Sequence, residues 1–252
     1  MPSLLDNDAF LEYLKSRILC DVSLREKRVA ITFDDGPNPN CTVRLMDLLD
    51  DKGIAATFFV VGRFVRRFPE IVTDAANRGH EIGNHTDHHI PLSILPDFVV
   101  RREIDAVGRL VREATGTQPR FLRPPMGWFN GRVLSIARGL GYVSVIGSVH
   151  PQDSKRPGTD AICERVLRRI EPGAIVILHD GGWWAGVDRN QTLEATDRIT
   201  DTLLDEGYQF DTLSKLVNRN KAGVGEVGKT EVLTFERSGI VEPLLKGLLP
   251  AM

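Results

Sequence analysis

Short apolar runs alternate along this chain with longer segments in which apolar positions recur at helical spacing. The runs predict seven strands, at 28–33, 55–61, 81–84, 120–123, 142–146, 174–178 and from 208. The intervening segments predict helices at 40–53, 64–77, 98–113, 131–140, 160–170 and 192–205. Asn40 and Asp160 are expected to cap the helices that they precede, and Gly53 to end the first of them.

The order of these elements indicates the fold class. Strand and helix alternate, and the strands are apolar runs without a polar face, as in parallel sheets covered by helices. This predicts a parallel α/β fold, either a barrel or a doubly wound sheet. The glycine pairs Gly36-Pro37 and Gly181-Gly182 match no phosphate-binding loop, which makes a nucleotide-binding sheet the weaker choice.

The two ends of the chain differ from this pattern. Residues 4–19 carry apolar positions at helical spacing, and we assign 1–27 to a helical extension. The alternating elements occupy 28–219, which we assign to one domain. Residues 221–229 are rich in glycine and lysine and predict a loop, so 220–252 is assigned to a C-terminal tail.

Composition adds mainly exclusions. The chain has 252 residues, 42% of them hydrophobic, and a net charge of −2 gives no electrostatic basis for binding nucleic acid or anionic membranes. Cys20, Cys41 and Cys163 form neither a metal spacing nor a disulfide framework, and are expected to be packed thiols. The N-terminus has no signal-like apolar segment and no stretch suits a membrane span, so we expect a cytoplasmic protein.

Polar side chains gather where the predicted strands end, which is where parallel α/β folds bind ligands. Asp34 and Asp35 follow the first strand, and two adjacent carboxylates repel unless a cation, proton or arginine compensates them. Alone, the pair is better explained by a turn before Gly36. The later strands end in further polar residues, which favours a site over a turn: Asn84 to His89, Arg123, His150, Asp153, and His179 with Asp180.

The histidines indicate a metal. His85 and His89 are four residues apart, and on a helix they would share one face. Two histidines and a carboxylate form a hydrolytic metal set, although Thr86 stands where a zincin has glutamate. We expect His80 to be structural, whereas His88 is either exposed to solvent or part of the pocket wall.

These residues fall into motifs that resemble those of the polysaccharide deacetylase family (NodB homology domain, carbohydrate esterase 4). The resemblance spans about 28–218 and rests on TFDDGP at 32–37, TFFVVG at 57–62, HTDHH at 85–89, RPPMG at 123–127, Asp153, and ILHD at 177–180. It implies a distorted (β/α) barrel with about seven parallel strands. It also implies a metal-dependent hydrolase that cleaves a non-peptide carbon–nitrogen bond.

The resemblance further implies a role for each motif residue. Asp35, His85 and His89 would bind a divalent metal ion, with zinc expected and cobalt, manganese or nickel as alternatives. The catalytic group would comprise Asp34 as general base, Arg123 paired with Asp34, His179 as general acid and Asp153 bonded to His179. The expected substrate-binding residues are Pro125, Met126 (through its backbone N–H), Trp128, Ile177, Leu178 and Trp183.

Some positions depart from the family pattern. Met126 replaces a tyrosine, Ser154 replaces a tryptophan and His150 replaces a carboxylate. An aromatic wall is therefore missing, and Trp128, Trp183 or Trp184 are candidates to replace it, since aromatic rings stack on sugars. Arg189 and Gln191-Thr192 would either bind substrate or cap the last predicted helix.

Three functions are therefore in competition. The first is removal of an N-acetyl group from an N-acetylglucosamine-type polysaccharide or oligosaccharide. The second is an amidase or deformylase acting on another small or lipid-linked N-acyl compound, favoured by the altered aromatic wall. The third, a catalytically silent carbohydrate-binding module, is disfavoured because a base, three metal ligands and an acid are all present.

Overall fold

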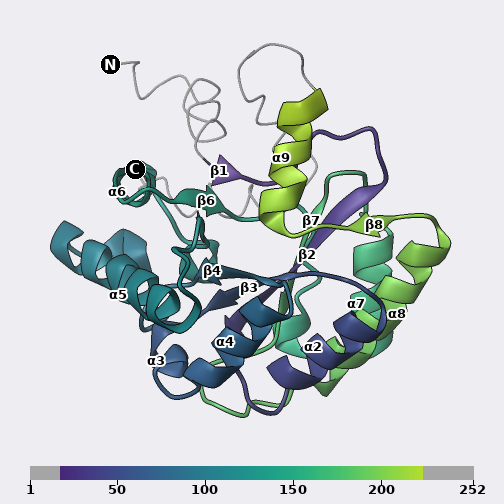
Figure 1. Ribbon diagram of the computed structural model, residues 1–252, viewed down its shortest axis with the longest axis horizontal. Coiled ribbons are helices and arrows are strands. Elements are labelled where there is room, and N and C mark those ends of the chain that lie inside the picture. The colour runs from purple at the N-terminus through teal and green to yellow at the C-terminus, as the bar shows by residue number, and fades with distance from the viewer. Residues whose placement is uncertain (1–17, 224–252) are drawn as a thin grey trace, which may run out of the picture.

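A barrel of parallel strands forms the centre of the molecule in this computed structural model, which describes residues 18–223 (Figure 1). Neighbouring strands follow the order β1-β6-β5-β4-β3-β2-β7, and β8 pairs with the start of β2. This confirms the α/β class and the parallel strands. The strands are β1 (Ile18–Leu19), β2 (Arg28–Gly36), β3 (Thr57–Val60), β4 (Glu81–Asn84), β5 (Phe121–Leu122), β6 (Val143–Val145), β7 (Ile175–His179) and β8 (Gln209–Phe210).

The barrel closes irregularly between β6 and β7. Val149, in the chain that follows β6, forms an isolated parallel bridge with Val176 of β7. Its carbonyl accepts the N–H of Ile177 at 2.8 Å, and the Ser148 N–H donates to the Ile175 carbonyl at 3.0 Å. Because β7 also pairs with β2, these few bonds complete the ring, and the barrel is distorted as expected.

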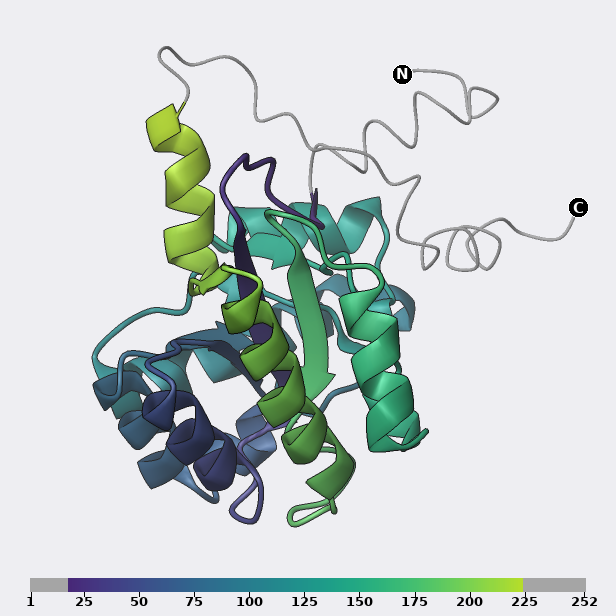
Figure 2. The ribbon, with the colours of Figure 1, turned by 90° about the vertical axis from the view of Figure 1, so that its right-hand side faces the viewer.

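Helices cover the outside of the barrel in both views (Figures 1 and 2). Among residues 18–223, no helix is both long and apolar enough to cross a membrane. The helices are α2 (Thr42–Asp51), α3 (Gly62–Val65), α4 (Pro69–Asn77), α5 (Asp97–Thr115), α6 (Gly131–Gly139), α7 (Thr159–Leu167), α8 (Asn190–Asp205) and α9 (Leu213–Gly223).

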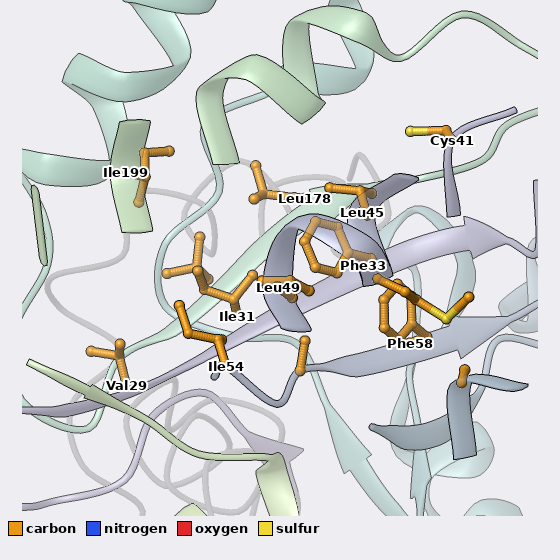
Figure 3. Close-up of a cluster of buried hydrophobic side chains, with 14 of the residues drawn as sticks. Val29, Ile31, Phe33, Cys41, Leu45, Leu49, Ile54, Phe58, Leu178 and Ile199 are labelled. Atoms are coloured by element: carbon orange, nitrogen blue, oxygen red, sulfur yellow. The ribbon is translucent and has the colours of Figure 1, made fainter. Parts of the chain in front are cut away.

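Alternate residues of each strand face opposite sides of the sheet, and this sorts the core. On β2, Ile31 and Phe33 point outward and pack against Leu45 and Leu49 of α2 and Ile199 of α8 (Figure 3). The inward-facing residues of β2, β3, β5, β6 and β7 form a separate cluster that α9 closes, comprising Ala30, Phe59, Phe121, Val145, Ile175, Leu213 and Leu216. All three cysteines are buried free thiols.

This inner cluster leaves one end of the barrel for polar side chains. The first turn of α9 bonds to the starts of strands: Leu213 N–H donates to Thr57, and Ser214 N–H to Glu81. The amino ends of the strands are therefore filled and capped. The inward positions near the carboxyl ends of the strands carry the polar motif residues instead.

Some predicted elements differ in the structure. Ile18–Leu19 is a strand, so the sheet begins before the predicted boundary at 28; the rest of the predicted 4–19 helix lies outside the described residues. The single helix predicted at 64–77 is two helices, because Pro69 begins a new helix at its first position. Helix α9 was not predicted, and it runs to Gly223, into the predicted loop at 221–229.

The predicted capping residues are also wrong. The N-cap position of α2 is Cys41 and that of α7 is Gly158, and neither helix has a side-chain cap. Asn40 instead uses its backbone N–H, which donates to Oδ1 of Asn38. Asp160 lies in the first turn of α7 and forms an ion pair with Arg198 of α8.

Candidate active site

A pocket of about 440 Å³ opens at the carboxyl ends of the strands. Its walls bring together motif residues that are far apart in the sequence: Asp34, Asp35, His85, His89, Arg123 and His179 all line it. The gathering of these residues, predicted from the strand ends, is therefore present. The fold achieves it because parallel strands deliver their following residues to one edge.

Asp34 faces into the barrel at the end of β2 and pairs with Arg123. Its Oδ1 accepts a hydrogen bond from Nη1 of Arg123 at 2.6 Å, and the same Nη1 donates to the Thr32 hydroxyl at 2.8 Å. The guanidinium also lies over the ring of Phe59, 4.1 Å from its centroid. Burial lowers the pKa of Arg123 and the Asp34 carboxylate opposes that shift. The contact fixes Oδ1 of Asp34 and leaves Oδ2 on the pocket side, 4.0 Å from Nε2 of His85.

Asp35, His85 and His89 form a three-residue cluster in the same pocket. Oδ1 of Asp35 lies 3.5 Å from Nε2 of His85 and 3.1 Å from Nε2 of His89. Although buried, this oxygen has no hydrogen-bond partner among the described residues. Nδ1 of His85 lies 2.7 Å from the Arg123 carbonyl, which can only accept, so Nδ1 carries the proton and Nε2 keeps its lone pair. An orphaned carboxylate oxygen and an oriented imidazole fit a divalent metal.

The protonation states suit metal binding as well. Burial, reinforced by the nearby His85, lowers the pKa of His89 to about 4, so its ring is neutral at pH 7. For Asp35, burial acts to raise the pKa, but His85, His179 and His89 together hold it below its usual range. The cluster thus offers one carboxylate and, at His89, a neutral imidazole.

The histidine pair does not lie on a helix, contrary to the sequence-based expectation. Residues 85–89 form an irregular loop in which Thr86 and His89 have positive φ angles of 67° and 56°. Asn84 and Thr86 hold the loop, since their side-chain oxygens accept the N–H groups of Thr86 and His89. The two rings still meet, with centroids 4.8 Å apart. Asp35 has a positive φ of 74°, so two proposed ligands sit on strained backbone.

The remaining histidines of this region lie outside the pocket wall. His88 is half exposed, and both its N–H and its Nδ1 contact the buried Glu103 at 2.8 Å. The neighbouring Asp87 is held by Arg66 at 2.6 and 2.8 Å. His80 is buried against Phe58, and its Nδ1 accepts the N–H of Ala56.

His179 ends β7 and is held by Asp153. Nδ1 of His179 lies 2.8 Å from Oδ1 of Asp153, and the backbone N–H of His179 donates to Oδ2, also at 2.8 Å. The Thr192 hydroxyl donates a further hydrogen bond to Oδ2 of Asp153. Burial acts to lower the pKa of His179, but Asp153, Asp35 and Asp34 raise it to about 9. The ring is therefore a cation at neutral pH, with Nε2 free of Asp153.

His150 also lines the pocket, and its ring centroid lies 5.9 Å from that of His179. Burial, with the neighbouring His179 cation, lowers the pKa of His150 to about 4. Where the family pattern has a carboxylate, this chain therefore places a neutral ring. Ser154 lines the pocket as well, and it contributes no aromatic surface.

Of the six predicted substrate-binding residues, the structure brings Met126, Ile177 and Trp183 to the pocket. Leu178 is fully buried in the outer core, because adjacent strand residues face opposite sides. Pro125 and Trp128 are also absent from the pocket wall, so the structure does not bring these three residues to the site. The apolar wall that was not predicted comes from Pro124, Gly127 and Ile146.

Two charged residues near the site have contacts that sequence reasoning did not identify. Asp180 is buried, accepts a hydrogen bond from Thr42, and has a pKa raised to about 7 by burial. Arg189 lines the pocket, and its Nε and Nη1 donate to the carbonyls of Gly181 and Ser154 at 2.7 and 3.1 Å. In the described chain, Arg189 makes no ion pair. It occupies the N-cap position of α8, but its side chain ties two loops together.

Glycines allow β2 and β7 to end side by side. A Cβ atom on Gly181 would lie 1.9 Å from the carbonyl oxygen of Asp35. A Cβ atom on Gly36 would lie 2.3 Å from Oδ2 of Asp180. The two strand ends that carry Asp35 and His179 are therefore in backbone contact that no larger residue permits.

Comparison with known proteins is consistent with this geometry. A sequence model described as polysaccharide deacetylase matches residues 21–145. The chain is 40% identical over 199 residues to a peptidoglycan-N-acetylglucosamine deacetylase of Bacillus cereus, covering 78% of this chain and 91% of that protein. It is 37% identical to a chitooligosaccharide deacetylase of a Bradyrhizobium species, covering 75% and 90% of the two chains.

Solved structures show the same likeness. A peptidoglycan N-acetylglucosamine deacetylase in complex with a benzamide compound superposes with a TM-score of 0.78 at 31% identity, covering 83% of this chain and 96% of that one. A second neighbour, from Bacillus anthracis, is described as a pseudoenzyme of carbohydrate esterase family 4. It has a TM-score of 0.73 at 28% identity, covering 82% and 71%. The shared fold alone therefore does not decide activity, and the residues in the pocket must.

Proposed function

Because this chain belongs to the polysaccharide deacetylase family, we propose that it removes the N-acetyl group from an N-acetylglucosamine-type carbohydrate. One observation carries the proposal. Asp34, the cluster of Asp35, His85 and His89, and the His179–Asp153 pair all meet in one pocket. Two relatives are named as deacetylases of peptidoglycan and of chitooligosaccharides, and this supports a carbohydrate substrate.

Asp35, His85 and His89 would hold the divalent metal ion on which the family depends, and we propose zinc. Such an ion supplies Lewis acidity and makes water a stronger nucleophile near neutral pH. The chain's own contribution is to present one carboxylate oxygen and the Nε2 atoms of two imidazoles. The Arg123 carbonyl fixes the ring of His85 through its other nitrogen.

Asp34 acts as general base in this proposal. Arg123 occupies its Oδ1, which leaves Oδ2 to accept a proton from the attacking water. Its bond to the buried guanidinium also keeps the Asp34 side chain from rotating. The base is thus oriented before substrate binds.

His179 acts as general acid. Its raised pKa of about 9 keeps the ring protonated at neutral pH, so it can give a proton to the leaving amine. Asp153 holds Nδ1, which leaves Nε2 as the donor to substrate. Base and acid are therefore separate residues of the pocket.

The acyl group would bind between these two residues. Ile177 and Ile146 line the pocket and offer an apolar surface for the acetyl methyl group. We propose that the Met126 N–H donates to the carbonyl oxygen as charge develops there. Met126 adopts a positive φ of 59°, which turns its backbone away from the helical path of the neighbouring residues.

Acetate release from tetra-N-acetylchitotetraose and from peptidoglycan fragments, with added zinc, cobalt, manganese or nickel, tests this function. We expect release with at least one metal and none in the presence of a chelator. Asp34→Asn should lower it by about 10²- to 10⁴-fold in protein that binds the same amount of metal. Hydrolysis of small non-sugar amides without release from either glycan would instead favour the amidase alternative. No hydrolysis with any metal would favour a silent carbohydrate-binding module.

A further inference from the structure

Trp183 is the one tryptophan that faces the pocket. All three tryptophans lie in the described part of the chain, and Trp128 and Trp184 are exposed but do not line it. Trp183 is 61% exposed, and its ring meets the His89 ring edge to face, with centroids 5.7 Å apart. A large apolar surface is thus held open to solvent beside a proposed metal ligand.

The loop that carries Trp183 is anchored through its backbone. It runs from the end of β7 at Gly181 to Arg189, and three of its carbonyls accept side-chain hydrogen bonds. Arg63 donates to the Trp183 carbonyl at 3.0 Å, Asn38 to that of Val187 at 2.9 Å, and Arg189 to that of Gly181 at 2.7 Å. Arg63 and Asn38 come from other segments and Arg189 ends the loop itself, so the backbone that carries the exposed ring is held at three points.

Arg63 is the anchor nearest to the ring. It belongs to the short helix α3 and forms no ion pair within residues 18–223, so its polar contact is the Trp183 carbonyl. Its guanidinium also lies 4.7 Å from the centre of the Phe64 ring. Nearby in the sequence, Arg67 lies over Phe68 and makes no contact with the loop among the described residues.

A second position in the pocket, Ser154, lacks an aromatic side chain. This residue lines the pocket but has no ring, so the pocket lacks apolar surface at that position. Sugar rings have apolar C–H faces that pack on aromatic rings, whereas small N-acyl compounds without a ring would gain little from such a surface. An exposed, anchored indole beside the reacting centre therefore favours a pyranose substrate.

We propose that Trp183 is the surface on which the pyranose ring of the acetylated sugar stacks, and that Arg63 positions it. The inference rests on the proposed deacetylase function and names the residues that favour its carbohydrate substrate over small non-sugar amides. Trp183 determines specificity in this proposal, and the acid, base and metal ligands act on either class of substrate.

Steady-state kinetics of the zinc-loaded enzyme test the proposal, with tetra-N-acetylchitotetraose and p-nitrophenyl acetate as substrates. Trp183→Ala should raise KM for the oligosaccharide about tenfold, as expected for loss of an aromatic contact, with kcat nearly unchanged. Trp184→Ala is the matched control and should leave KM unchanged. For p-nitrophenyl acetate, which has no sugar ring, Trp183→Ala should change kcat/KM by a smaller factor than for the oligosaccharide, and Trp184→Ala should match the wild type.

Arg63→Met should raise the oligosaccharide KM in the same direction by a smaller factor, whereas Arg67→Met should not. Calorimetric titration of the metal-free protein with the oligosaccharide supplies a readout that does not depend on turnover. Binding that weakens in Trp183→Ala, without acetate release by the wild type, would support stacking and overturn the deacetylase function. Acetate release with the same KM in wild type and Trp183→Ala would overturn stacking alone. Absence of both binding and release would overturn both.

Discussion

Nδ1 of His179 lies 2.8 Å from Oδ1 of Asp153, and the contact is closed off from solvent because Asp153 is fully buried. The same carboxylate accepts the backbone N–H of His179 and the Thr192 hydroxyl. It thereby fixes the orientation and the protonation state of the imidazole together. Four consequences for experiment come from this and the neighbouring contacts.

Asp153→Asn should move the alkaline limb of activity to lower pH. The general acid must be protonated, and Asp153 helps to hold the pKa of His179 at about 9, against an ordinary value of 6.5. Removing the charge lets burial dominate, so kcat/KM should begin to fall near neutral pH. A profile of kcat/KM between pH 5 and 10 would measure this, and an unmoved limb would contradict the assignment.

The free energy of unfolding should depend on pH in the same direction. The His179–Asp153 pair stabilises the fold below pH 6.5, and this contribution is lost as pH rises through about 9.

Asp34→Asn should lower kcat by about 10²- to 10⁴-fold, the usual contribution of a general base. Metal content should stay at the wild-type level, because Asp35, His85 and His89 are unchanged. Acetate release and metal per protein chain, measured on the same sample, separate the two effects. Asp51→Asn, at an exposed position of α2, is the control and should match the wild type. Joint loss of metal and activity would place Asp34 among the ligands.

Zinc should raise the melting temperature, since a ligand that binds only the folded state at 100 times its Kd adds about 2.7 kcal/mol. His85→Ala and His89→Ala should abolish this shift, and a chelator should reverse it in the wild type. His88→Asn should keep the shift, because His88 contacts Glu103 outside the pocket and asparagine retains a donor. A shift that depends on His88 would instead point to its cluster with Asp87 and Glu103.

Arg189→Met should lower the free energy of unfolding by roughly 2–4 kcal/mol, since two hydrogen bonds from a buried cation are lost. The methionine keeps much of the aliphatic side chain, so the loss reports on the bonds to the Gly181 and Ser154 carbonyls. Urea denaturation gives the value. Arg198→Met, which removes an exposed ion pair to Asp160, should change stability little. Equal effects at both positions would show that Arg189 has no special structural role.

Much of the fold was predictable because its strands are buried on both faces and stand out as apolar runs. The strand predicted at 81–84 has the observed bounds, and the others differ by a few residues at their ends. The helix at 64–77 was wrong because Pro69 also suits a first helical position, so it began a second helix. Ile18–Leu19 is too short to be recognised in the sequence as an apolar run, and it is a strand only because β6 pairs with it.

Site residues could be predicted where the signal lies in neighbouring residues of the sequence. They could not be predicted where their position depends on tertiary contacts. Asp34, Asp35 and His179 end strands, and the sequence marks those ends. The choice of Ile177 over Leu178 was also available, because residues two apart on β7 share a face with His179. The positive φ angles that bring His85 and His89 together are not visible in the histidine spacing. Nor are the contacts of Arg63 and Arg189, whose partners are backbone carbonyls distant in sequence.

The close contact between Gly36 and Gly181 has a consequence for mutational tolerance. Neither residue has a side chain to offer substrate or metal, yet the added Cβ would meet the Asp180 carboxylate in one case and the Asp35 carbonyl in the other. In a library of all single substitutions, both positions should reject even alanine, as strictly as the metal ligands reject change. A selection for folding alone would separate the two classes: it should spare changes at the ligands and still eliminate those at the glycines.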